Sequence, residues 1–322
     1  MAPKRLKMCL ARRSTADRKE QRALVGRLKD VLVQPRTRRR YEVAMDRFLL
    51  FLKQNGDTYP ATFVELDDRL SEYVEYLWES GDSKGWAGDA LSSVIFHVPA
   101  CRPFLAGGWR LHAAWSRREL PSRAPPFTPL ILHGLCGYCR DQGWGDTVLL
   151  LLLGWHTYAR SGELFGATAG DFVIGRRGTG VWRLPLSKSG QRNGAQECLT
   201  ITDEFVGRRV AAIISTKSAG SPLSDNSAVV HRCRLRDACQ ALGLTHGFRW
   251  YSVRRGGATE GYRRSGDLAA IMLRGRWSAT KTARIYLTDG LAHLADLCLT
   301  PAQERRLRLL ALSVRQSFDA AT

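Results

Sequence analysis

The chain has 322 residues, of which 44% are hydrophobic, so it is long enough for two compact domains and is not disordered throughout. Its 49 Lys and Arg residues outnumber 30 Asp and Glu residues, which gives a net charge of +19. This surplus favours a polyanionic partner, because phosphate contacts release condensed counterions. Nucleic acid is the leading partner, and a ribosomal or membrane-surface protein is the alternative.

The longest apolar run, residues 148–153, is far shorter than the roughly 20 residues that a membrane-spanning helix needs. The basic N-terminus lacks the apolar segment of a secretory signal. The sequence therefore predicts an intracellular protein without a membrane partner. Residues 3–7 also fit a nuclear import signal, so a nuclear location is expected if the host is eukaryotic.

Residues 1–35 predict a basic, flexible tail. The first 40 residues hold fourteen Lys or Arg and only three Asp or Glu. Like charges at this density repel one another, so such a segment is expected to become ordered only on a polyanion.

Residues 36–120 predict a small helical domain that binds DNA. Apolar residues from Tyr41 to Leu52 recur at steps of three and four, which is the pattern of an amphipathic helix. Further helices are predicted over 67–79, from Trp86 to residue 95 and around 111–115. The segment 121–126 contains three prolines and is interpreted as the linker to a second domain.

Residues 121–322 predict a domain that combines helices with three short strands. Thr128 is expected to cap a helix, and the run 148–155 is hydrophobic all round, so it should lie in the core. Short β-rich segments at 171–174, 181–186 and 197–201 predict an antiparallel sheet, and helical patterns then continue to the end. The predicted fold class is mainly α with a small antiparallel β-sheet.

The segment 248–287 has Tyr286 as its second-last residue, and several cationic residues lie near this tyrosine in the sequence. A phenol has a pKa near 10 and is a poor nucleophile at neutral pH, so a tyrosine that performs chemistry needs cations beside it. The segment also contains the pair Arg254 and Arg255, followed by Gly256 and Gly257. The glycines fit either a close approach of the backbone to DNA or a helix entry that needs small residues.

Three short motifs in this order resemble the catalytic domain of the tyrosine recombinase (phage integrase) family. They are Ala-Arg-Ser-Gly-Glu-Leu at 159–164, Tyr-Ser-Val-Arg-Arg at 251–255, and Gly-Arg-Trp at 275–277 leading to Ala-Arg-Ile-Tyr at 283–286. The interval from Arg254 to Trp277 is 277 − 254 = 23 residues, and that from Trp277 to Tyr286 is 9. The resemblance covers about 128–294, and the helical domain before it is similar in kind to the family's core-binding domain.

The resemblance implies an enzyme that breaks and rejoins DNA through a 3′-phosphotyrosyl intermediate on Tyr286. Arg160, supported by Glu163, and Arg254 would hold the non-bridging oxygens of the scissile phosphate. Lys188 would be the general acid for the leaving 5′-oxygen, with Arg192 as the alternative in the same turn. Trp277 would donate its indole N–H to a phosphate oxygen or pack behind the nucleophile.

Further cationic residues near the motifs are expected to contact DNA. This predicted set is Arg255, Arg276, Lys281, Arg284 and Arg192. The resemblance also implies a homotetramer on DNA, in which the C-terminal helix docks on a neighbouring protomer; packing on its own domain is the alternative. No metal or cofactor is implied, since Cys136 and Cys139 lack a second pair of ligands and are expected to be buried thiols.

Tyr251 departs from the family, because it occupies the position of the usual histidine. A phenol can donate a hydrogen bond there but ionises poorly near pH 7. This substitution favours one alternative to a recombinase, a catalytically degenerate or domesticated DNA-binding protein of the same fold. A type IB topoisomerase would share the chemistry and is the other alternative.

Overall fold

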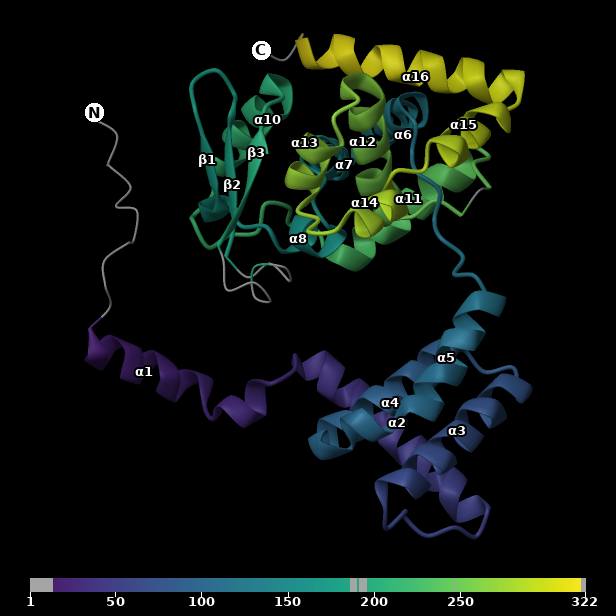
Figure 1. Cartoon of the computed structure of the whole chain (residues 1–322). Coiled ribbons are helices and arrows are strands. Elements are labelled where there is room, and N and C mark those ends of the chain that lie inside the picture. Colours follow the sequence, from purple (N-terminus) through teal and green to yellow (C-terminus); the bar gives the residue numbers. More distant parts are fainter. Residues whose placement is uncertain (1–13, 186–189, 191–195, 246, 320–322) are drawn as a thin grey trace. The chain divides into compact units, whose positions relative to one another are not determined.

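The computed structural model describes residues 14–185, 190, 196–245 and 247–319, and it forms two compact units that divide between Ser122 and Arg123 (Figure 1). Among these described residues, the elements of unit 1 are all helices, whereas unit 2 combines helices with a small antiparallel sheet. The predicted fold class, mainly α with a small sheet, is confirmed.

Unit 1 is built around helices α2 to α5, which share one core that includes Phe48, Leu70 and Leu91. Its elements are α1 (Thr15–Val25), η1 (Leu28–Val31), α2 (Pro35–Gln54), α3 (Phe63–Glu79), α4 (Lys84–His97), η2 (Pro99–Phe104) and α5 (Ala106–Arg118). Helix α3 begins earlier than predicted because Thr62 and Glu65 form a capping box.

Helix α1 lies within the stretch for which the sequence predicts a flexible tail. Ser14 and Asp17 cap it reciprocally: the Ser14 hydroxyl accepts the Asp17 N–H at 3.1 Å, and the Asp17 carboxylate accepts the Ser14 N–H at 3.0 Å. These two bonds satisfy N–H groups that a helix otherwise leaves without partners. The prediction of a flexible tail depends on the density of like charge, which does not reveal this capping pair.

Unit 2 contains every predicted catalytic residue that the structure describes. Its elements are α6 (Pro129–Asp141), α7 (Gly145–Thr157), α8 (Ser161–Gly166), η3 (Ala169–Asp171), β1 (Phe172–Ile174), β2 (Gly180–Leu184), β3 (Glu197–Ile201), α10 (Glu204–Ile214), α11 (Ala228–Ala241), α12 (Trp250–Ser265), α13 (Leu268–Gly275), α14 (Thr280–Tyr286), α15 (Asp289–Leu297) and α16 (Pro301–Asp319). The strands pair antiparallel in the order β1-β2-β3, and Trp182 faces Phe172 on one side and Leu199 on the other.

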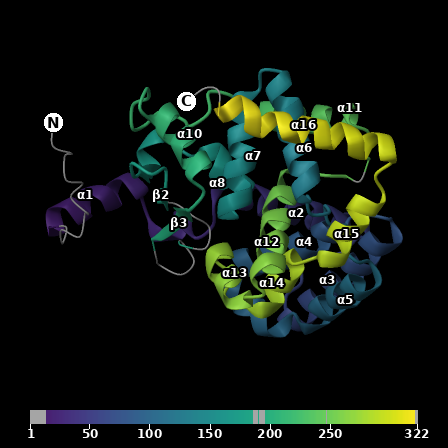
Figure 2. The same cartoon turned by 90° about the horizontal axis from the view of Figure 1, so that it is seen from above.

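Helix α7 is the central helix of unit 2, as its all-round hydrophobicity predicts. Leu150, Leu151 and Leu153 are each 1% exposed or less. Helices α6 and α12 and strand β3 all contact α7 (Figures 1 and 2). Since α7 ends three residues before Arg160, this rigid helix fixes the position where the first arginine motif begins.

Gly256 and Gly257 allow helix α12 to pack tightly on the segments before it. A Cβ at Gly257 would lie 2.2 Å from the Trp155 carbonyl oxygen, and one at Gly256 would lie 2.4 Å from the Phe127 carbonyl oxygen. Both residues are buried. The glycines lie within α12 and not at its entry, and the atoms that approach them closely belong to the protein.

Gly257→Ala is therefore expected to destabilise unit 2 by about 1–3 kcal/mol, because the added methyl overlaps backbone atoms that cannot rotate away. Urea unfolding followed by tryptophan fluorescence measures this change. Gly162→Ala is the matched control, since its Cβ would meet nothing within 4 Å. Equal stability of the two variants would contradict this packing role.

Helix α16 packs along α6 within its own unit (Figure 2). Leu307 is completely buried, and Val314 is 4% exposed. Within the single chain α16 packs on its own domain, and docking on a neighbouring protomer stays a prediction.

His231 lies at the centre of a buried polar network that joins α7 to α11. Its Nδ1 lies 3.0 Å from the Thr147 hydroxyl and its Nε2 lies 3.0 Å from the Ser224 hydroxyl. Asp146 accepts hydrogen bonds from Ser224 and from Arg234, both at 2.8 Å. Burial lowers the pKa of His231, an effect that nearby Asp146 opposes and Arg234 reinforces.

Because His231 is buried, we expect the free energy of unfolding to fall at acidic pH. The folded-state pKa of His231 is below the unfolded value near 6.5, so its stabilising effect is present above pH 6.5 and is lost as the pH falls below it. We expect a loss of up to about 1.4 kcal/mol per pH unit from this residue. Urea unfolding of the wild type and of His231→Gln between pH 5 and 8 measures it; an equal pH dependence of both proteins would refute the prediction.

Cys136 and Cys139 are free and buried, as predicted, and burial raises the pKa of both thiols. In the described part of the chain, no group of three or more His, Cys, Asp or Glu residues is arranged to hold a metal ion. Among the same residues, no helix has the length and hydrophobicity needed to cross a membrane.

Candidate active site

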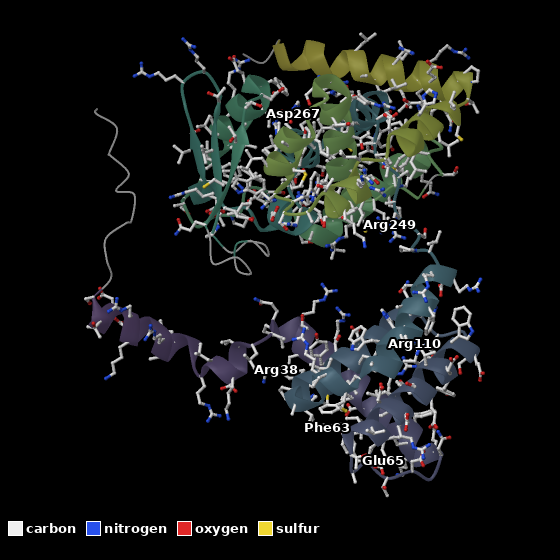
Figure 3. All side chains as sticks on the ribbon, in the orientation of Figure 1. Arg38, Phe63, Glu65, Arg110, Arg249 and Asp267 are labelled. Carbon is white, nitrogen blue, oxygen red and sulfur yellow. The ribbon has the colours of Figure 1, made fainter. Side chains whose placement is uncertain are left out.

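The three motifs meet in unit 2 around a tight turn formed by residues 275–277. Helices α12, α13 and α14 contact one another at this turn (Figures 1 and 2). Asp267, labelled in Figure 3, starts α13 by accepting the Ala270 N–H at 2.9 Å. At the other end of α13, Arg276 adopts a left-handed conformation with φ 56° and ψ 47°. For a residue other than glycine this conformation costs roughly 1–2 kcal/mol, so other contacts must stabilise the turn.

Arg254 lies under this turn and is 1% exposed. Its Nη2 donates to the Gly275 carbonyl at 2.6 Å, and its Nη1 donates to the Tyr158 carbonyl. Its Nε is buried and has no partner among the described residues. Burial, and then the nearby charge of Arg160, lowers the pKa of Arg254. A buried guanidinium with an unsatisfied donor, close to a second arginine, is suited to receive an anion.

Tyr286 covers Arg254 from the side of α14. The ring centroids of Tyr286 and Trp277 lie 4.4 Å apart, and the Arg254 guanidinium lies 5.0 Å from the Trp277 ring and 5.1 Å from the Tyr286 ring. Trp277 is 6% exposed, and its buried indole N–H has no partner among the described residues. The predicted nucleophile, tryptophan and second arginine therefore form one stack.

Arg160 begins α8 beside the same turn. Its backbone N–H and its Nη1 donate to the Glu163 carboxylate at 2.7 and 2.9 Å. The Arg160 side chain is 28% exposed and lines a cavity of about 630 Å³ between α8 and β2. It is thus more accessible to a phosphate than Arg254.

Glu163 connects the first arginine motif to the turn. Both terminal nitrogens of Arg276 donate to the Glu163 carboxylate, Nη2 to Oε2 at 2.6 Å and Nη1 to Oε1 at 3.0 Å. Burial alone would raise the pKa of Glu163, but hydrogen bonds and charge from Arg276 and then Arg160 hold it below its usual range. Glu163 is therefore ionised at neutral pH and can orient both arginines.

Tyr251 lies beside Tyr286, with ring centroids 5.4 Å apart. It is 39% exposed. Burial and its interaction with Tyr286 raise the pKa of Tyr251 well above the ordinary value. The hydroxyl consequently stays protonated at neutral pH, so it can donate a hydrogen bond but is a weak base.

Two of the residues predicted to contact DNA are buried. Arg255 is 1% exposed, and it donates to the carbonyls of Ala124 and Ile285. The Arg276 side chain is 8% exposed and forms ion pairs with Glu163 and Glu197. These placements correct the prediction, because both guanidinium groups lie inside the unit and hold its segments together.

The remaining predicted DNA contacts stay predictions. Lys281 and Arg284 are exposed on α14, the helix that ends at Tyr286. Lys188 and Arg192 lie outside the described residues. Arg249, labelled in Figure 3, is exposed at the start of α12, and no motif singled it out.

The motifs also did not reveal Glu197 or the carbonyl groups that hold Arg254. Glu197 accepts a hydrogen bond from Arg276 at 2.8 Å across a sequence separation of 79 residues. Such a pair leaves no local signal in a single sequence. Backbone carbonyls leave none at all, because every residue carries one.

Similar structures identify the fold. The Tn1549 transposon integrase in complex with a circular intermediate DNA superposes with a TM-score of 0.58 at 13% identity, covering 87% of this chain and 98% of the other. In its complex with transposon right end DNA the same integrase gives 0.57 at 13% identity, with equal coverage. A lambda integrase dimer bound to a COC′ core site gives 0.53 at 15% identity, covering 85% and 76%.

No protein-family model and no curated protein matches the sequence. At identities of 13–15%, the structural likeness establishes the fold. The chain therefore has a fold similar to that of these integrases.

Proposed function

We propose that this protein is a DNA strand-transferase of the tyrosine recombinase type, which cleaves and rejoins double-stranded DNA in recombination or integration. The observation that carries the proposal is the stack of Tyr286, Trp277 and buried Arg254, with Arg160 beside it. The excess of basic residues over the whole chain, +19 in net charge, supports a DNA partner. The known structures with this fold include integrases in complex with DNA.

In the proposed reaction the Tyr286 oxygen attacks the scissile phosphorus and loses its proton. The bond from phosphorus to the 5′-oxygen breaks, and the 5′-oxygen leaves as a hydroxyl after taking up a proton. The products are a 3′-phosphotyrosyl ester and a free 5′-hydroxyl, which conserve the number of phosphate ester bonds. A second 5′-hydroxyl then reverses the attack, so the chemistry needs neither ATP nor a metal.

Arg160 and Arg254 would stabilise the charge that builds up on the phosphate oxygens. Arg160 is exposed enough to contact the phosphate first. Arg254 is covered by the Tyr286 ring, so binding of a phosphate at its unsatisfied Nε requires the ring to move off the guanidinium. The same movement would bring the Tyr286 hydroxyl out of the stack and toward the phosphorus. Lys188, with Arg192 as the alternative, remains the proposed general acid.

A duplex with a nick just beyond the scissile phosphate tests this function. Cleavage releases a short fragment that carries the 5′-hydroxyl, so religation fails and the covalent adduct accumulates. A library of nicked duplexes is needed, since the target site is unknown. An adduct that resists boiling in detergent is expected; DNA binding without an adduct on any duplex would overturn the proposal.

Tyr251 supports a second candidate, a DNA-binding protein that has kept the fold and lost cleavage. The phenol offers no acid or base near neutral pH, because burial raises its pKa. This candidate predicts tight, salt-sensitive DNA binding and no adduct. The nicked-duplex assay therefore separates the two functions.

The first function assigns Tyr251 a role as hydrogen-bond donor to a phosphate oxygen. Tyr251→Phe is then expected to slow adduct formation by on the order of a hundredfold, as loss of one such donor does. Tyr251→His should restore cleavage with a rate that falls above about pH 6.5, where an imidazole loses its proton. The wild type should lack that decline. Single-turnover rates from pH 5.5 to 8 measure both effects, and a Phe variant as fast as the wild type would exclude the role.

A further inference from the structure

Arg276 joins four charged side chains of unit 2 into one chain of ion pairs. The order is Arg160, Glu163, Arg276 and Glu197, with alternating sign and no net charge. Glu163 and Glu197 are 10% and 13% exposed, so water screens these pairs much less than pairs on the surface. A network of this kind sets the direction of its members as well as their stability.

The backbone conformation at Arg276 indicates that the turn needs the contacts of this side chain. Its φ of 56° lies in the region that favours glycine. Asn or Gly would fit the turn with less strain, yet an arginine stands there and forms a bidentate pair with Glu163. The ion pairs offset the strain of the turn.

The same turn also reaches the other parts of the site. The carbonyl of Gly275 accepts a hydrogen bond from Arg254, and the ring of Trp277 stacks on that of Tyr286. Arg274, two residues earlier in α13, donates to Thr202 just after β3, whereas Arg276 pairs with Glu197 at the start of that strand. The turn is thus held to both ends of β3.

We infer that Arg276 is a positioning residue that aims Arg160 at the scissile phosphate through Glu163, and that Glu197 fixes Arg276 for this task. The inference rests on the proposed function, since it concerns the cleavage step. Glu163 carries the coupling because both arginines donate to its Oε1, at 2.9 and 3.0 Å. Without Arg276, the Glu163 carboxylate can rotate, and Arg160 loses its fixed direction.

Arg276→Gly is the decisive variant, because glycine keeps the left-handed backbone while it removes the side chain that pairs with Glu163. It is expected to slow single-turnover adduct formation by on the order of tenfold to hundredfold, as small misplacements of a catalytic group do. DNA affinity should change little, whereas the thermal midpoint should fall, because two buried carboxylates lose their partner. Arg276→Lys should recover part of the rate, since an ammonium keeps the charge but not the fork.

A double-mutant cycle tests whether Arg276 acts through Arg160. If it does, Arg276→Gly has little further effect in an Arg160→Ala background, so the two losses do not multiply. Glu197→Gln should show the same dependence on Arg276. Arg274→Met is the matched control on the same helix; it touches neither carboxylate, and its effect should multiply with that of Arg160→Ala.

Independent, multiplying losses from Arg276→Gly and Arg160→Ala would overturn the inference, as would adduct formation by Arg276→Gly at the wild-type rate. These outcomes are distinct from failure of the proposed function. In that case the wild type itself forms no adduct, and the inference falls with it.

Discussion

Replacing Tyr286 with phenylalanine is expected to abolish covalent adduct formation while leaving DNA binding intact. The substitution removes only the hydroxyl, so the ring can still stack on Trp277 and cover Arg254. The fold and the charge of the site are therefore preserved. Because the hydroxyl oxygen is the proposed nucleophile, the variant has no atom at this position that can form the ester.

The measurement is a denaturing gel of end-labelled nicked duplex after incubation with each protein, alongside a binding titration. Tyr262→Phe is the matched control: this tyrosine is on α12 and is 39% exposed, as is Tyr251, but it has no ring contact with Tyr286 among those described. An adduct formed by the Tyr286 variant at the wild-type rate would remove this residue from the mechanism.

Arg160→Ala is expected to produce the second largest loss. The guanidinium would stabilise charge on the phosphate oxygens mainly in the transition state, and removing such a donor costs about 10²–10³ in rate. It also leaves the Glu163 carboxylate without one of its two arginines, although Arg276 still pairs with it. Stability should therefore change less than rate.

Single-turnover kinetics at saturating DNA measure this loss, because they separate cleavage from binding. Arg183→Ala is the matched control: Arg183 lines the same cavity as Arg160 but donates to the Gly170 carbonyl. We expect the control to change salt-dependent binding more than cleavage. If both variants lose the same rate, the cavity binds DNA without a special role for Arg160.

Much of the fold could be predicted because its signals are local. The apolar stripe that includes Phe48 and Leu52 marks α2, and the uninterrupted apolar run marks α7 as a core helix. The third strand has the predicted bounds, Glu197–Ile201. Each of these patterns depends only on residues within a few positions of one another.

The site was predictable in its order of residues but not in its contacts. The intervals between Arg254, Trp277 and Tyr286 indicated one site, and the structure brings these three side chains together. Charge alone misassigned Arg255 and Arg276, because an arginine that binds carbonyls or carboxylates within the fold has the same local sequence as one that binds phosphate. Their partners lie 30 to 131 residues away in the chain.

Backbone packing could not be predicted from the sequence either. Gly256 and Gly257 follow the paired arginines and fit a DNA contact, yet the atoms that exclude a side chain there belong to Phe127 and Trp155. A sequence shows that a glycine is present but does not show which segment approaches it. The structure assigns these glycines to the contact between α7 and α12.

The most direct test of the central claim is to identify the residue that carries the DNA. The adduct trapped on the nicked duplex can be digested with nuclease and protease, and the modified peptide sequenced by mass spectrometry. We predict a nucleotide attached through its 3′-phosphate to Tyr286. Attachment to neighbouring Tyr251, or a 5′-phosphate linkage, would contradict the account.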